Sequence, residues 1–115
     1  MSKIFVFGSN RQGRHGKGSA LEARLQWGAK YGQAEGLQGN SYGIITKELR
    51  HDYPSVTLNE VKQGVDKFLT FAKDHPEHEF IVVAIGCSLA GFKYEQIKPL
   101  FKDTPKNCWI HPNIS

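Results

Sequence analysis

Apolar runs and amphipathic segments alternate along the chain, and the alternation predicts the order strand, helix, strand, helix, strand, helix, strand. Runs of about four to eight apolar, β-branched and aromatic residues are typical of strands buried in a parallel sheet. On this pattern we expect strands at 3–7 (KIFVF), 43–46 (GIIT), 79–86 (EFIVVAIG) and 107–111 (NCWIH). The run at 79–86 has no polar interruption after Glu79, which predicts a central strand.

Three segments have the composition or spacing of helices. The first, residues 19–32, can be capped by Ser19 or Gly18, and its expected buried stripe consists of Ala20, Leu21, Leu25 and Trp27. Residues 57–75 are expected to form the longest helix, because Thr57 and Glu60 have capping-box spacing. Its apolar residues recur at helical intervals, at Leu58, Val61, Val65, Phe68, Leu69 and Ala72. The third, YEQIKPLFKD at 94–103, predicts a short helix with Pro99 in or before its first turn.

This order of elements predicts a single compact α/β domain over residues 1–115. Strands that alternate with helices favour a mostly parallel sheet with right-handed crossovers, flanked by helices. A chain of 115 residues fits one domain, and no repeat or linker divides it. The aromatic residues expected in its core are Phe5, Phe7, Phe68, Phe71, Phe80 and Trp109.

Two glycine-rich loops follow predicted strands, at residues 8–18 and 86–91. Ligands of open α/β sheets bind outside the carboxyl ends of the strands, and glycines let phosphate oxygens approach the backbone amides at a helix N-terminus. The spacing matches neither the dinucleotide fingerprint nor the P-loop. A third glycine-rich segment, 32–42, is either part of the same ligand surface or a simple surface excursion.

The net charge of +4 favours an anionic ligand, and its distribution is uneven. Around the first glycine-rich loop only Glu22 opposes the basic residues Lys3, Arg11, Arg14, Lys17, Arg24 and Lys30. This excess indicates either a phosphate-bearing ligand or a solvated basic face, and nucleic acid is the less favoured partner.

Composition excludes several other classes. Hydrophobic residues at 39% and charged residues at 23% are typical of a globular protein, and no apolar run approaches the ~20 residues that cross a membrane. Cys87 and Cys108 have no pairing pattern and are expected as thiols in a cytoplasmic protein without a membrane partner. The five histidines are scattered, so we expect neither a metal nor a cofactor.

Several segments resemble macrodomains. The stretch IGCSLAGFKYEQIKPLF is similar to their phosphate loop and following helix, above all in the deacylating branch, whose loop reads like IGCGLDG before an aromatic residue and an acid. Asn10 with HGKGSA resembles the first loop and helix of that fold, and YGIITK resembles the strand that carries a lysine to the ligand. The matches span roughly residues 4–110 in the family's order, and the pattern is also similar to short macro-like proteins of phage genomes.

The resemblance implies a three-layer macro-like fold that binds ADP-ribose or a related nucleotide diphosphate between its two loops. The implied ligand-binding residues are Gly8, Ser9, Asn10, Gly16, Lys17, Gly18 and Ser19 on one side, and Gly86, Cys87, Ser88, Leu89, Ala90, Gly91 and Phe92 on the other. Tyr42 and Phe92 stand beside the loops, where an aromatic ring can stack on a ribose or a base.

Two departures from the family's pattern bear on catalysis. Ser88 replaces a glycine, and Ala90 replaces the acid of the deacylating branch, which removes a general base. Lys47 is a candidate for Schiff-base attack on the opened ribose or is an exposed strand-end lysine. His15 is a candidate acid, base or phosphate ligand, or a plain loop histidine. Asn10 either orients a water or a ribose hydroxyl, or caps a local turn.

Three functions remain open at this point. In the first, the chain binds ADP-ribose or a related nucleotide diphosphate, with or without hydrolysis of a bond at the distal ribose; if it is an enzyme, it is an ADP-ribosyl hydrolase or an ADP-ribose phosphate phosphatase. Alternatively, it is a non-catalytic module that senses or sequesters a nucleotide signal. The third and least favoured function is that of an accessory protein associated with nucleic acid.

Overall fold

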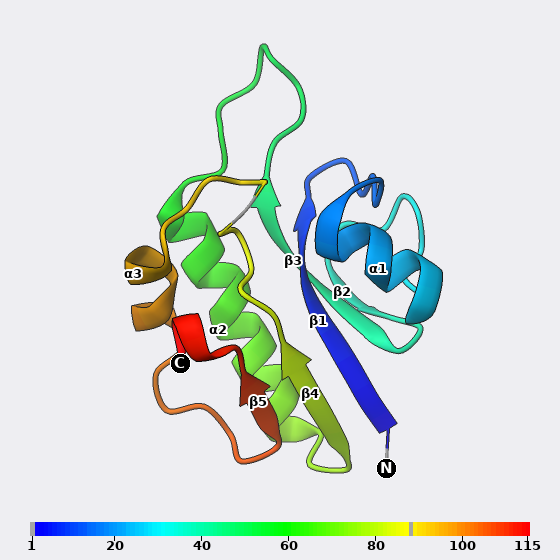
Figure 1. The fold of residues 1–115 in the computed structure, drawn as a ribbon, viewed down its shortest axis with the longest axis vertical. Coiled ribbons are helices and arrows are strands. Elements are labelled where there is room, and N and C mark those ends of the chain that lie inside the picture. The colour runs from blue at the N-terminus through cyan, green and yellow to red at the C-terminus, as the bar shows by residue number, and fades with distance from the viewer. Residues whose placement is uncertain (1, 88) are drawn as a thin grey trace.

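A computed structural model describes residues 2–87 and 89–115 of the chain (Figure 1). In this described part, one five-stranded sheet has the order β2-β3-β1-β4-β5. The strands are β1 (Ser2–Asn10), β2 (Gly36–Gln38), β3 (Ser41–Lys47), β4 (His78–Val82) and β5 (Cys108–Ile110). β1 pairs in parallel with β3 and β4, and β4 pairs in parallel with β5, whereas β2 runs antiparallel to β3.

Helices lie on both faces of this sheet (Figure 1). The helix α1 (Gly18–Gln26) covers one face, and α2 (Leu58–Asp74) with the short α3 (Tyr94–Ile97) covers the other. Single 3₁₀ turns follow as η1 (Lys98–Leu100), where Pro99 lies in the first turn, and η2 (Pro112–Ile114). The predicted α/β architecture, with three layers and a mostly parallel sheet, is therefore confirmed. No helix in the described residues is long and apolar enough to cross a membrane.

The predicted capping box begins α2. The Thr57 hydroxyl accepts a hydrogen bond from the Glu60 amide, and the Glu60 carboxylate accepts one from the Thr57 amide, each at 3.2 Å. The helix then buries one continuous stripe against the sheet, made of Val61, Gly64, Val65, Phe68 and Ala72. The expected span of 57–75 thus agrees with the observed one to within a residue at each end.

β1 divides the core into two halves because successive side chains of a strand point to opposite faces. Ile4 and Val6 pack in the cluster beneath α2, whereas Phe5 and Phe7 pack in the cluster beneath α1. Trp27 stacks on Phe5 with ring centroids 5.3 Å apart. β1, and not the expected strand at 79–86, is therefore the central strand of the sheet.

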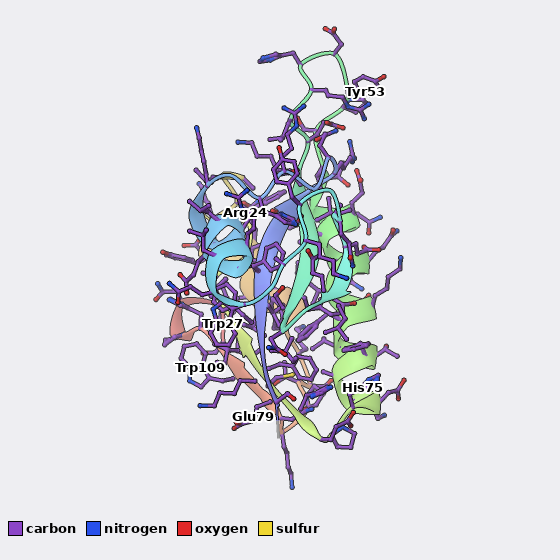
Figure 2. All side chains as sticks on the ribbon, turned by 90° about the vertical axis from the view of Figure 1, so that its right-hand side faces the viewer. Arg24, Trp27, Tyr53, His75, Glu79 and Trp109 are labelled. Carbon is purple, nitrogen blue, oxygen red and sulfur yellow. The ribbon has the colours of Figure 1, made fainter. Side chains whose placement is uncertain are left out.

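The burial of two large apolar residues differs from the prediction. Leu25 is 69% exposed, because α1 packs through Ala20 and Ala23 and Leu25 lies on the other side of the helix. Trp109 is 54% exposed, because its neighbours in β5 face the α2 side and Trp109 points to the face that α1 covers only in part (Figure 2). Phe5, Phe7, Phe68 and Phe80 are buried as predicted, and Phe71 is half-buried.

Element boundaries also differ at both glycine-rich loops. β1 continues through Gly8 to Asn10, so the first loop is shortened to residues 11–17. β4 ends at Val82, because the chain turns where the Ile85 amide donates to the Val83 carbonyl at 2.7 Å. β2 forms within the glycine-rich segment 32–42, where we predicted no strand, because its three residues can extend the sheet beside β3.

Two glycines of the first loop provide a matched test of its packing. Gly13 has a φ of +67°, and a Cβ there would lie 2.6 Å from the Gly32 carbonyl carbon, whereas a Cβ on Gly16 would meet nothing within 4 Å. We expect Gly13→Ala to lower the free energy of unfolding by about 2 kcal/mol or more, and Gly16→Ala to change it by less than about 0.5 kcal/mol. Urea unfolding measures both values, and equal losses would contradict this account.

Candidate functional site

A cavity of about 280 Å³ opens at the carboxyl ends of β1 and β3. We call it the strand-end pocket. Its lining comes from both glycine-rich loops, from β1, from α1 and from the end of β3, and consists of Gly8, Ser9, Asn10, Arg14, Gly16, Lys17, Ala20, Thr46, Lys47, Leu49, Leu89 and Ala90. A recess of about 50 Å³ shares five of these residues and adds Ser19, Ala84 and Gly86.

Strand pairing brings these residues together from distant parts of the sequence. β1 and β3 are parallel neighbours, so their carboxyl ends meet at one edge of the sheet, where Asn10 is paired with Lys47 after a register shift. The described residues between β4 and α3, 83–87 and 89–93, pass over the same edge (Figure 1). The two strand ends and the second loop lie close together, since a Cβ on Gly8 would lie 3.1 Å from the Thr46 side-chain hydroxyl and 3.2 Å from the Gly86 backbone nitrogen.

The strand-end pocket is electropositive. Its cations are Arg14, Lys17 and Lys47, and no Asp, Glu or His is among the described residues that line it. Lys17 is also the N-cap residue of α1, and its backbone has the extended conformation that exposes the first amides of the helix. Backbone amides and the dipole at a helix N-terminus favour negative charge, so helix and side chains attract the same kind of ligand.

Comparisons with known proteins identify the fold. No protein-family model and no curated protein sequence matches the chain. Two solved structures of proteins from Bacteroides thetaiotaomicron match with a TM-score of 0.61 at 20% identity, and one of them is described as a protein of unknown function. They cover 88% and 87% of this chain and 78% and 79% of their own chains.

A macrodomain protein from Streptomyces coelicolor matches with a TM-score of 0.58 at 16% identity, over 89% of this chain and 79% of that one. The chain has a macro-like fold. At this level of identity, the likeness establishes the fold alone. Because the expected sheet and flanking helices are observed, the fold implied by the sequence resemblance is confirmed.

Within the macro-like fold, Asn10 holds the first loop in shape. Its Nδ2 donates to the Arg14 carbonyl at 2.8 Å, and its Oδ1 accepts from the Arg14 amide at 2.9 Å. This is the geometry of the alternative in which Asn10 caps a local turn. Asn10 also lines the strand-end pocket, so the turn places the Arg14 backbone beside the cavity.

His15 lies away from the pocket, contrary to its expected place at the ligand. The side chain is fully buried, with Nε2 3.0 Å from the Gln33 carbonyl oxygen and 3.2 Å from Gln38 Oε1. Its ring also stands edge-on to Phe7, with centroids 5.1 Å apart. Because both close partners of Nε2 are oxygens, this nitrogen donates, and His15 ties the first loop to the segment that contains β2.

Residues of the second loop separate into two groups. Leu89 and Ala90 line the strand-end pocket and Gly86 lines its recess, whereas Cys87, Gly91 and Phe92 lie along a different hollow near α3. Phe92 closes the loop on itself, since its amide donates to the Gly86 carbonyl at 2.8 Å. Ser88 lies outside the described residues. The predicted site is thus brought together only in part.

Tyr42 and Cys87, two further residues of the predicted site, do not line the strand-end pocket. Tyr42 is buried in the α2 half of the core, 5.2 Å from Phe68 between ring centroids, so it does not stack on a ligand at the pocket. Burial raises the pKa of the half-buried Cys87 thiol, which leaves it protonated at neutral pH.

Within the described residues, no group of three or more His, Cys, Asp or Glu could hold a metal ion.

Beside the pocket stands a charged network that the sequence analysis missed, because nothing in the spacing of its members marks it. It centres on Glu48, whose side chain is 1% exposed. Hydrogen bonds hold the Glu48 pKa well below its usual range. The largest effect comes from the Arg50 side chain, and smaller ones come from the Arg50 amide, Arg11 and Gln12. The pKa of Glu60 is also lowered, chiefly by its hydrogen bond with Arg11.

These lowered pKa values predict a pH dependence of stability. A carboxylate with a depressed folded-state pKa stabilises the fold above its ordinary pKa, here 4.5, and loses that contribution as the pH falls towards the folded value. The free energy of unfolding of the wild type should therefore fall below about pH 4.5. We expect a shallower fall in Glu48→Gln, measured by urea unfolding at neutral pH and at several acidic values.

The control for this measurement is Asp66→Asn, which removes one member of the exposed Lys62–Asp66 pair on α2 and leaves the Glu48 network intact. Its stability should follow the wild-type pH profile more closely than that of Glu48→Gln. A Glu48→Gln profile as steep as that of the wild type would show that the Glu48 carboxylate does not contribute to acid unfolding.

Proposed function

We propose that the strand-end pocket binds ADP-ribose or a related nucleotide diphosphate. The observation that carries the proposal is the pocket's cationic lining, in which Arg14, Lys17 and Lys47 face one cavity at the N-terminus of α1. These groups match the negative charges of a diphosphate, and the pocket lies at the strand ends where α/β sheets bind ligands. The description of one structural match as a macrodomain protein supports the same choice.

The volume of the pocket supports a particular placement of the proposed ligand. Ligand pockets commonly measure about 300–1,000 Å³, and the strand-end pocket, at about 280 Å³, lies just below that range. We therefore assign the enclosed space to the diphosphate and one ribose. The base then lies outside it, where the partly exposed side chains of Leu49 and Leu89 offer apolar surface.

Binding without efficient turnover is the activity that this lining favours. Lys47 and Ala90 line the same cavity. On the resemblance to the deacylating branch, Lys47 is the candidate nucleophile and Ala90 stands where that branch has its acid. The described lining holds no Asp, Glu or His that could act there as a general base. Because positioned acid–base catalysis usually contributes a factor of about 10² to 10⁴ in rate, hydrolysis should be slow.

Titration calorimetry with ADP-ribose tests the proposal directly. Arg14→Ala and Lys17→Ala should each weaken binding by up to about fivefold, because an exposed charge contact contributes about 1 kcal/mol or less. Wild-type affinity should fall as salt is added, and the variants should show a shallower dependence. Lys73→Ala is the control, since Lys73 lies in the last turn of α2, an element that supplies none of the described lining residues.

Absence of ADP-ribose binding by the folded wild type would refute the proposal. Binding that is insensitive to salt and to both substitutions would instead show that phosphate attraction at this pocket is not the driving interaction. NAD and ATP, titrated under the same conditions, show whether the site requires the distal ribose.

An Ala90→Asp substitution tests whether the missing acid limits turnover. We expect the variant to hydrolyse glutamate-linked ADP-ribose about 10²-fold faster than the wild type, or more, because the carboxylate can move protons for Lys47. Adding Lys47→Ala should abolish the gain, and product release measures it. Robust wild-type turnover that disappears in Lys47→Ala alone would contradict a binding-only function.

A further inference from the structure

An arm, residues 48–56, projects between β3 and α2 beside the strand-end pocket, with Tyr53 near its tip (Figure 2). Arg11 of the first loop fastens the base of this arm. Its guanidinium donates to Glu48 at 3.2 Å and to the Pro54 carbonyl at 2.7 Å, which lie on opposite legs of the arm, and it also pairs with Glu60 in α2. One side chain therefore holds both legs against the body of the protein.

Glu48 is the acceptor at the centre of these contacts. Besides Arg11, the Gln12 amide group donates to Glu48 at 2.6 Å, and Arg50 donates to it through its backbone amide and its guanidinium at 3.0 to 3.2 Å. Both carboxylate oxygens are thus paired. A carboxylate with an exposure of 1% requires such pairing, since an uncompensated buried charge is strongly destabilising.

The residues on either side of Glu48 both line the strand-end pocket. These are Lys47, the cation at the end of β3, and Leu49, the apolar residue that follows. The same network restrains the backbone of each, since the Arg11 amide donates to the Lys47 carbonyl at 3.0 Å and the Leu49 amide donates to Gln12 Oε1 at 3.1 Å. The wall of the pocket is therefore fixed by contacts made on its outer side.

We propose that Glu48 is a positioning residue for ligand binding. By pairing with Arg11 and Gln12, it keeps Lys47 and Leu49 in place at the pocket wall and thereby raises the affinity for the anionic ligand, without contacting the ligand itself. This inference rests on the proposed function, because its main readout is the binding of ADP-ribose.

Charge and positioning predict opposite effects of a Glu48 substitution on ligand affinity, so a binding measurement distinguishes them. Replacing Glu48 with glutamine removes a negative charge near a pocket for an anion, and Coulomb attraction alone would then strengthen binding. Loss of positioning acts in the opposite direction, because Lys47 and Leu49 must be ordered again when the ligand binds. Weaker binding by Glu48→Gln therefore cannot come from the change in charge.

The experiment compares the ADP-ribose affinity of the wild type, Glu48→Gln and Asp52→Asn by calorimetry, at a temperature where circular dichroism shows each protein folded. Asp52 is an exposed acid of the same arm, so its variant matches the change in charge while leaving Glu48 and its partners in place. We expect the dissociation constant of Glu48→Gln to rise about tenfold, and that of Asp52→Asn to stay equal or fall. Equal or tighter binding by Glu48→Gln would overturn the proposal.

A second readout separates this proposal from the proposed function. Hydrogen exchange of the Leu49 amide should be faster in Glu48→Gln than in Asp52→Asn, because the Gln12 acceptor is no longer held. If the wild type binds no ADP-ribose, the proposed function fails, and the exchange rate alone then tests the positioning. Equal protection of the Leu49 amide in the two variants would overturn it.

Gln12→Ala provides an independent test of the positioning role if Glu48→Gln does not fold. The substitution changes no charge and removes two hydrogen bonds, the one that Gln12 donates to Glu48 and the one that it accepts from the Leu49 amide. We expect a loss of affinity of about threefold, smaller than for Glu48→Gln because Arg11 still holds the carboxylate. Unchanged affinity in folded Gln12→Ala would overturn the positioning role.

Discussion

β1 is hydrogen-bonded on both sides, to β3 and to β4, and is buried on both faces between α1 and α2. Its parallel pairing with β3 forces two carboxyl ends to the same edge of the sheet, and the loops that follow them must meet there. The strand-end pocket exists because of this constraint. Its cation Lys47 ends β3, whereas Arg14 and Lys17 stand in the loop after β1, and only strand pairing places them around one cavity.

Charges around the strand ends are separated into two environments. The described lining of the pocket carries cations without carboxylates, so its potential is positive, which fits the diphosphate that we propose as its ligand. The nearby acids, Glu48 and Glu60, are instead neutralised by Arg11 and Arg50 at the base of the arm. Separation of this kind allows acids to stabilise the loops next to the proposed anion site without repelling the anion.

Local signals predicted the elements but not always the faces they bury. The α2 helix could be read from its capping box and its apolar repeat, because both are properties of a single helix. Leu25 and Trp109 are as apolar as many core residues, yet both are exposed, since burial depends on which layer covers a position. β2 was not predicted, because three residues carry little periodicity and only their pairing with β3 makes them a strand.

By itself, the sequence determined the α/β class, the order of the main elements and the two glycine-rich loops beside the strand-end pocket, because apolar periodicity and glycine placement are local features. Only the tertiary structure decided which residues reach the cavity. It buried His15 beside Gln33 and Gln38, separated Gly91 and Phe92 from the pocket, and joined Glu48 to Arg11 across the base of the arm. These arrangements join positions far apart in the chain, and no spacing along one strand or helix encodes such contacts.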